Sequence, residues 1–320
     1  MNSRSRRILG ALVVIVALGL LPSILNETDL RNFARFLVLV LAVLGVNVAV
    51  GAGGIVSLGH SVFVGVGAFA FVSLCEDLGV PILLALPFAA LISGLVGVVL
   101  GFPSLRVRNS QYALVSFGYA IAVPPFARWC RTITGGPTGR TLERTIWAPD
   151  WLPLSDIEVR YSVAMLTVFA CGLLATNYLS GRWGRSAKAQ RDDALAAATF
   201  GVPISRSRSG VLGLSAGLSG MAGALSILLF PYANISEYTV MMSLRLYASA
   251  VIGGLGSAVG SLWGVMSLWL LPMLGRLIGL GGGADLIFGL SVLLLSYSQV
   301  DGIVGLVREM RRRMTSGRNG

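Results

Sequence analysis

Charged residues are scarce in this chain. They make up 12% of its 320 residues, whereas a soluble domain has about 25%. Hydrophobic residues account for 55% of the chain, and its mean hydropathy is +0.79. This composition excludes an ordinary soluble globular protein. It predicts an all-α, polytopic integral membrane protein.

Lysine and histidine each occur once, as Lys188 and His60. A P-loop needs a lysine followed by serine or threonine after a glycine-rich turn. Ala189 follows Lys188 instead, so we expect no ATP site of this type. The three cysteines lack the spacing of metal ligands, and no nucleophile triad is evident. We therefore predict no enzyme activity, no metal site and no cofactor in this chain.

The net charge of +11 could suggest nucleic-acid binding. The basic residues, however, cluster in loops and at the chain ends rather than on a soluble face, which favours a membrane lipid environment over nucleic acid. Positive charge in short loops marks the cytosolic side of a membrane protein. The arginine-rich segment 308–320 is therefore predicted to be a cytosolic tail, and both termini are predicted to be cytosolic.

The remaining residues, 1–307, form the predicted transmembrane domain. A span needs about 20 apolar residues, and about ten segments are transmembrane or partly spanning. We place them near residues 8–25, 32–50, 60–75, 80–101, 111–128, 160–179, 209–231, 241–257, 260–279 and 284–300. The first is expected to be a retained span, since it has no persuasive cleavage site. Glycines four residues apart, such as Gly97 with Gly101 and Gly213 with Gly217, are typical of close helix packing.

Two predicted loops differ in charge. Residues 129–159 mix acids with arginines and tryptophans and are expected to form an extracytoplasmic loop, whereas 180–208 is strongly basic and is expected in the cytosol. Within the latter, Ser186 is a plausible N-cap and residues 187–200 favour helix. Gly201 and Pro203 form the expected stop signal. This helix could dock a soluble partner, or it could only link two spans.

A glycine-rich run interrupts the second predicted span. Gly51, Gly53 and Gly54 disfavour continuous helix. Irregular backbone at membrane depth needs protein or water to satisfy its polar groups. We therefore predict a broken or re-entrant segment beside a transport pathway. Asn47, Ser57 and His60 are polar candidates near it. Asn47 and His60 could cap helices or make interhelical hydrogen bonds. For His60, a role in a proton relay is the alternative.

Several motifs resemble one family. Residues 191–201, RDDALAAATFG, resemble the coupling-loop motif of ABC importer permeases, in particular the branched-chain amino acid permeases. Further matches occur in the order expected of the family, at residues 47–60, 105–116, 134–139 and 253–257. The chain departs from the family pattern at Ile55, Ala194 and Leu195, where polar or acidic residues are frequent.

The resemblance implies a permease subunit that forms the membrane pathway for branched-chain or related hydrophobic amino acids. It implies a second permease subunit, two ATPase subunits that bind the ATP, an extracytoplasmic solute-binding protein and a bacterial plasma membrane location. The implied ATPase-coupling residues are Arg191, Asp192, Asp193, Ala196, Ala197 and Gly201. The pathway candidates are Asn47, Gly51, Gly53, Gly54, Ser57 and His60.

Other functions remain open from the sequence. The same scaffold could transport urea, short amides or nucleosides. An ion-coupled secondary transporter would need buried acids, and the predicted span centres have essentially none. A membrane scaffold without transport activity is a third alternative.

Overall fold

The computed structural model describes residues 26–105, 109–144 and 155–277, together with residues 289, 290, 302 and 305. The predicted first span, most of the predicted tenth span and the basic tail 308–320 lie outside the described residues. So does the segment 145–154 of the predicted outer loop.

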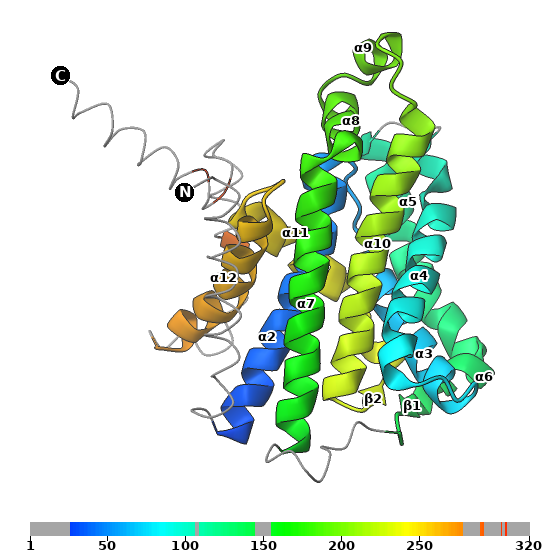
Figure 1. Cartoon of the computed structure of the whole chain (residues 1–320), viewed down its shortest axis with the longest axis vertical. Coiled ribbons are helices and arrows are strands. Elements are labelled where there is room, and N and C mark those ends of the chain that lie inside the picture. The colour runs from blue at the N-terminus through cyan, green and yellow to red at the C-terminus, as the bar shows by residue number, and fades with distance from the viewer. Residues whose placement is uncertain are drawn as a thin grey trace, which may run out of the picture.

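The described chain is a bundle of helices (Figure 1). Its α-helices are α2 (Glu27–Asn47), α3 (His60–Glu76), α4 (Ile82–Gly101), α5 (Asn109–Trp129), α6 (Arg131–Thr134), α7 (Asp156–Ser180), α8 (Arg182–Asp192), α9 (Ala194–Thr199), α10 (Ile204–Leu229), α11 (Val240–Gly253) and α12 (Ala258–Leu277). A π-helix, η2 (Val48–Ala52), continues α2, and short 3-10 turns are η3 (Phe102–Leu105), η4 (Gly136–Thr138) and η5 (Ile235–Glu237). Two short antiparallel strands, β1 (Arg140–Thr141) and β2 (Tyr232–Ala233), pair Arg140 with Ala233.

Four of the described helical segments are long and apolar enough to cross a membrane: residues 27–52, 82–105, 156–180 and 204–229. They coincide with four of the predicted spans. The most apolar stretches of α2 and α10 are 78% buried, against 28% for α4 and 22% for α7. The bundle therefore has α2 and α10 inside and α4 and α7 outside.

The last described spans differ from the prediction. Two separate crossings were expected near 241–257 and 260–279. Instead α11 has only 14 residues, and α12 follows a short break at an angle of 119°. The pair is a broken span or a re-entrant loop. The physical reason is Gly254 and Gly256, whose φ angles of 112° and 80° place them in the left-handed region that favours glycine.

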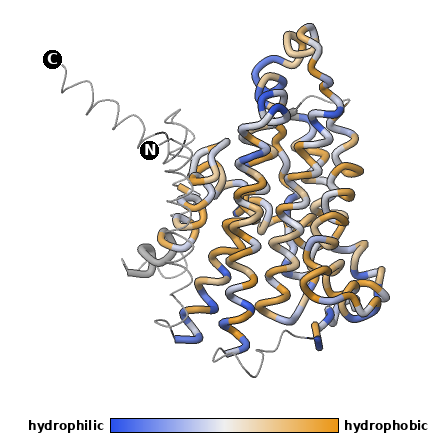
Figure 2. Tube along the Cα trace, in the orientation of Figure 1, coloured by the Kyte–Doolittle hydropathy of each residue, from blue (hydrophilic) through white to orange (hydrophobic). Residues whose placement is uncertain are grey.

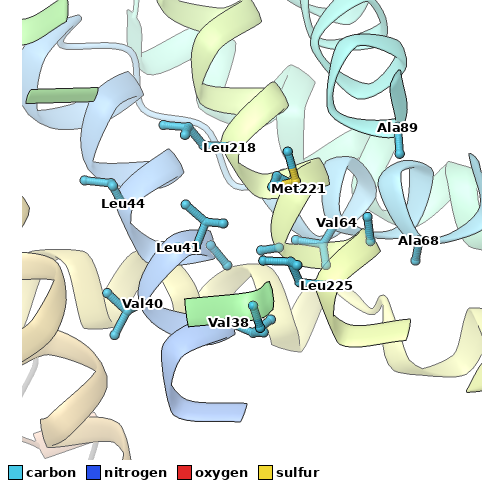
Figure 3. Close-up of a cluster of buried hydrophobic side chains, with 14 of the residues drawn as sticks. Val38, Val40, Leu41, Leu44, Val64, Ala68, Ala89, Leu218, Met221 and Leu225 are labelled. Atoms are coloured by element: carbon cyan, nitrogen blue, oxygen red, sulfur yellow. The ribbon is translucent and has the colours of Figure 1, made fainter. Parts of the chain in front are cut away.

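Small residues let the inner helices approach closely. A Cβ on Gly97 of α4 would lie 2.2 Å from the Cβ of Ala216 on α10, and one on Gly67 of α3 would lie 2.0 Å from the carbonyl oxygen of Gly220. The expected role of the Gly97–Gly101 pair in helix packing is thus confirmed. Around these contacts, apolar side chains of α2, α3 and α10 gather in one cluster, which includes Leu41, Val64 and Leu225 (Figure 3).

The two ends of the bundle are different. Helices α8 and α9 project from one end, and the β1–β2 pair lies at the other (Figure 1). Hydrophilic residues gather at α8, whereas hydrophobic residues follow the lengths of the long helices (Figure 2). The described part of the predicted loop 129–159 and the loop 180–208 therefore lie at opposite ends.

Candidate pathway and coupling site

The predicted break after α2 is present. The chain turns into the π-helix η2 at Val48 and is no longer helical beyond Gly53. Gly54 has a φ of 64°, which a residue with a Cβ adopts at a cost. The Ile55 amide donates to the Ala49 carbonyl at 3.0 Å, so part of the irregular backbone is satisfied internally.

Asn47 joins this break to the turn between α11 and α12. Its Nδ2 donates to Ser261 Oγ at 2.9 Å and to the Ser257 carbonyl at 3.2 Å. Its Oδ1 accepts from the Gly256 amide at 2.9 Å. A Cβ on Gly51 would lie 2.0 Å from that same Gly256 nitrogen. The expected interhelical hydrogen bonding of Asn47 is confirmed, and the two irregular segments pack directly against each other.

His60 is fully buried at the start of α3 and connects three helices. Its Nε2 lies 2.7 Å from Ser215 Oγ on α10, and that hydroxyl donates to the Gly45 carbonyl of α2 at 2.7 Å. Its Nδ1 lies 3.3 Å from the Ser57 carbonyl. None of these contacts involves a carboxylate. The arrangement favours interhelical hydrogen bonding over a proton relay.

Ser57 faces a pair of tyrosines on α5. Its hydroxyl lies 3.5 Å from the Tyr119 hydroxyl, which is 3.1 Å from the hydroxyl of Tyr112. The Leu58 amide donates to Ser116 Oγ at 2.9 Å. Neither tyrosine was predicted from the sequence as a site residue. Their spacing of seven residues, which places them on one helix face, was the available signal.

The predicted loop 180–208 contains two helices, which corrects the single helix expected over 187–200. Helix α8 begins at Arg182, so Ser186 lies inside it and is not its N-cap. Asp193 breaks the helix, because its carboxylate accepts from the amides of Leu195 and Ala196 and caps α9. At the far side, α10 begins at Ile204, before the predicted residue 209. Gly201 is left-handed, with a φ of 78°, as its expected C′ position requires.

Helix α9 presents apolar side chains to the outside. Leu195 is 83% exposed and Phe200 is 88% exposed, whereas Ala197 is buried. Ala196 and Asp192 are also exposed. Leu195 and Phe200 therefore place apolar surface at the tip of the projecting segment.

Arg191 connects the projecting loop of α8 and α9 with the glycine-rich break. Its Nη1 donates to the Gly51 carbonyl, and a Cβ on Gly54 would lie 2.6 Å from its Cγ. Arg191 also lies 3.8 Å from the Asp192 carboxylate. The two candidate regions, which the sequence places about 140 residues apart, therefore form one site.

These features define the class: a polytopic membrane protein whose broken inner helices contact a projecting loop. The chain belongs to the family described as branched-chain amino acid transport system / permease component, whose model matches residues 30–296. The family expected from the motifs is thereby confirmed.

Two curated relatives are similar to the chain. The high-affinity branched-chain amino acid transport system permease protein LivM of Salmonella typhimurium is 27% identical over 276 residues, which cover 79% of this chain and 64% of the relative. LivM of Escherichia coli is 29% identical over 236 residues, which cover 67% of this chain and 56% of the relative. The chain thus spans less than two thirds of the length of either. No solved structure gives a significant match.

Proposed function

We propose that this chain is the permease subunit of an ABC importer and lines the membrane pathway for branched-chain or related hydrophobic amino acids. Separate ATPase subunits bind the ATP, a second permease subunit completes the pathway, and an extracytoplasmic binding protein delivers the solute. The family membership and the names of both relatives support this proposal.

One observation above all supports ATPase coupling: Arg191 of the projecting loop contacts the carbonyl of Gly51 in the broken helix. A soluble motor bound to α8 and α9 would be in direct contact with a residue that holds irregular backbone inside the bundle. The exposed side chains of Leu195 and Phe200 supply an apolar surface on which that motor can dock.

The proposed mechanism uses this hydrogen-bonded connection. Closure of the ATPases displaces α8 and α9 as a unit. Arg191 transmits the displacement to η2, and Asn47 passes it to the turn at Gly256. Because both irregular segments pack against each other, they move together, and ATP binding biases an equilibrium between two arrangements of the pathway.

The charges support an orientation in a bacterial plasma membrane. Helix α8 contains Arg182, Arg185, Lys188 and Arg191 and lies on the cytosolic side in this proposal. The β1–β2 end then faces outward, toward the binding protein, and both termini are cytosolic.

Uptake of radiolabelled L-leucine into vesicles that contain the full complex tests the proposal. We expect uptake with ATP on the ATPase side and none with a nonhydrolysable ATP analogue. Vesicles with a proton gradient but without ATP serve as the control. Uptake that follows the gradient and ignores ATP would show that the chain belongs to an ion-coupled transporter instead.

A further inference from the structure

A cavity of about 380 Å³ lies between α2, α3, α10 and the segment that contains η5. It is lined at Ala222 and Ser226 of α10 and at Phe230 just after that helix, whereas the His60 contact is farther back on α10 at Ser215. Seven residues of helix correspond to about 10 Å. The cavity therefore lies on the β1–β2 side of the His60 hydrogen bonds, away from α8 and α9. Its volume is within the range of about 300–1,000 Å³ that is typical of small-molecule sites.

Two opposite charges line this cavity. Arg35 comes from α2, and Glu237 comes from η5, about 200 positions later in the chain. Neither makes an ion pair with any residue in the described part of the chain. The Arg35 guanidinium lies 4.7 Å from the centre of the Phe230 ring, which holds it at the cavity edge. A cation and an anion that share a cavity without pairing are both available to a ligand that has both charges.

A third polar group in the lining is buried. Tyr238 is 6% exposed, and its hydroxyl makes no hydrogen bond within the described residues. Ser226 also lines the cavity, and its hydroxyl donates to the Gly223 carbonyl at 2.6 Å. A buried hydroxyl without a hydrogen bond is costly. It therefore points to a ligand group that supplies the missing partner.

The rest of the lining is apolar. It consists of Val38, Leu39, Ala42, Val64, Ala222, Ile227, Phe230 and Met242. A second cavity of about 280 Å³, which Tyr238 also lines, has no charged residue in its lining. Only the larger of the two combines both charges with an apolar wall.

We propose that this larger cavity binds the zwitterion of a hydrophobic amino acid. The α-carboxylate pairs with Arg35, the α-ammonium pairs with Glu237, and the Tyr238 hydroxyl completes the hydrogen bonding of the charged end. The side chain lies against the apolar wall that includes Val38 and Met242. This assignment rests on the proposed transport function, and it places the solute in the permease on the side opposite the coupling loop.

Direct binding of L-leucine to the purified complex in nanodiscs tests the site. Two analogues separate the charges: isopentylamine lacks the carboxylate, and 4-methylpentanoate lacks the ammonium. We expect Arg35→Gln to weaken leucine binding at least tenfold and to leave isopentylamine binding unchanged. Glu237→Gln should weaken leucine binding by a similar factor and leave the binding of 4-methylpentanoate unchanged. The matched controls are Arg31→Gln and Glu27→Gln, an exposed pair on the same helix α2, which should leave all three affinities unchanged.

Tyr238→Phe tests the site with a variant that should fold normally, because the substitution removes only the hydroxyl. We expect several-fold weaker leucine binding, with a melting temperature no lower than that of the wild type, since the removed hydroxyl has no hydrogen-bond partner within the described residues. The assignment is overturned if the wild-type complex binds no leucine, or if leucine binds with equal affinity to Arg35→Gln, Glu237→Gln and the wild type. The assignment is also overturned if Arg35→Gln and Glu237→Gln each weaken the binding of all three ligands by the same factor.

ATP-driven uptake distinguishes failure of the site from failure of the proposed function. If the wild type transports leucine with ATP and Arg35→Gln transports it equally well, the transport function stands and the cavity is not the site. If the wild type shows no ATP-driven uptake but the reciprocal binding pattern holds, the cavity assignment stands and the transport function is wrong.

Discussion

The side chain of Arg191 donates a hydrogen bond to the backbone carbonyl of Gly51. One residue lies near the end of α8, outside the bundle proper, and the other lies in the π-helical turn η2 that follows α2. The contact joins the projecting loop to irregular backbone inside the bundle. In the proposed function, this contact is the route by which the ATPase subunits act on the pathway.

Arg191→Gln removes this connection. A hydrogen bond from a charged group contributes about 1.5–3 kcal/mol, and each 1.4 kcal/mol is about a factor of ten. We expect leucine uptake to fall about tenfold while ATP hydrolysis by the complex continues. Both rates are measured on the same vesicles. Arg185→Gln is the control, since Arg185 donates to the Ser180 carbonyl near the same helix. Equal loss of uptake and ATP hydrolysis in the Arg191 variant would contradict a coupling role.

Gly51→Ala should destabilise the protein. The added Cβ would lie 2.0 Å from the Gly256 nitrogen, so backbone must shift. Overpacking of this kind costs about 1–3 kcal/mol. Thermal unfolding in detergent measures the loss. Gly118→Ala on α5 is the matched control, because nothing lies within 4 Å of its added Cβ. A melting temperature for Gly51→Ala equal to that of the wild type would show that η2 and the α11–α12 turn are not in close contact.

Phe200→Ser should weaken assembly without unfolding the chain. Phe200 is 88% exposed, so its apolar surface stabilises a complex and not the fold. We expect less ATPase to copurify with the variant, at an unchanged melting temperature. Leu78→Ser, at a residue that is 72% exposed beyond the end of α3, is the control and should retain the ATPase. Retention of the ATPase by Phe200→Ser would exclude Phe200 from the docking surface.

Asp77 and Arg140 should stabilise the β1 segment in a pH-dependent way. The Arg140 guanidinium donates to both Asp77 oxygens, at 2.6 and 2.8 Å, and this lowers the pKa of the Asp77 carboxyl below its ordinary value. A lowered pKa in the folded state contributes stability above the unfolded-state pKa, and this contribution is lost as the pH falls through the folded-state pKa. Because the pair is partly exposed, we expect less than about 1 kcal/mol.

The measurement is the difference in thermal stability between the wild type and Asp77→Asn. It should be small and positive at pH 7 and should vanish at a pH below the folded-state pKa. A difference that grows as the pH falls would have the wrong sign for this ion pair.

Much of the architecture was accessible from the sequence. Long apolar runs predicted the inner helices α2 and α10, and Gly51, Gly53 and Gly54 predicted the break after α2, because helix propensity is a local property. The division of 187–200 at Asp193 was missed. At Asp193, the side chain can cap a new helix instead of continuing the existing one. The surrounding alanines are compatible with both structures.

The sequence by itself determined that the protein lies in a membrane, where its second span is broken and which family it resembles, since hydropathy, glycine and short motifs act over neighbouring residues. Only the tertiary structure decided that Arg191 reaches Gly51 and that Arg35, Glu237 and Tyr238 line one cavity. These residues lie far apart in the chain, and their proximity depends on how α2, α8 and α10 pack. Such packing is set by the summed contacts of many small and apolar side chains, which no local pattern records.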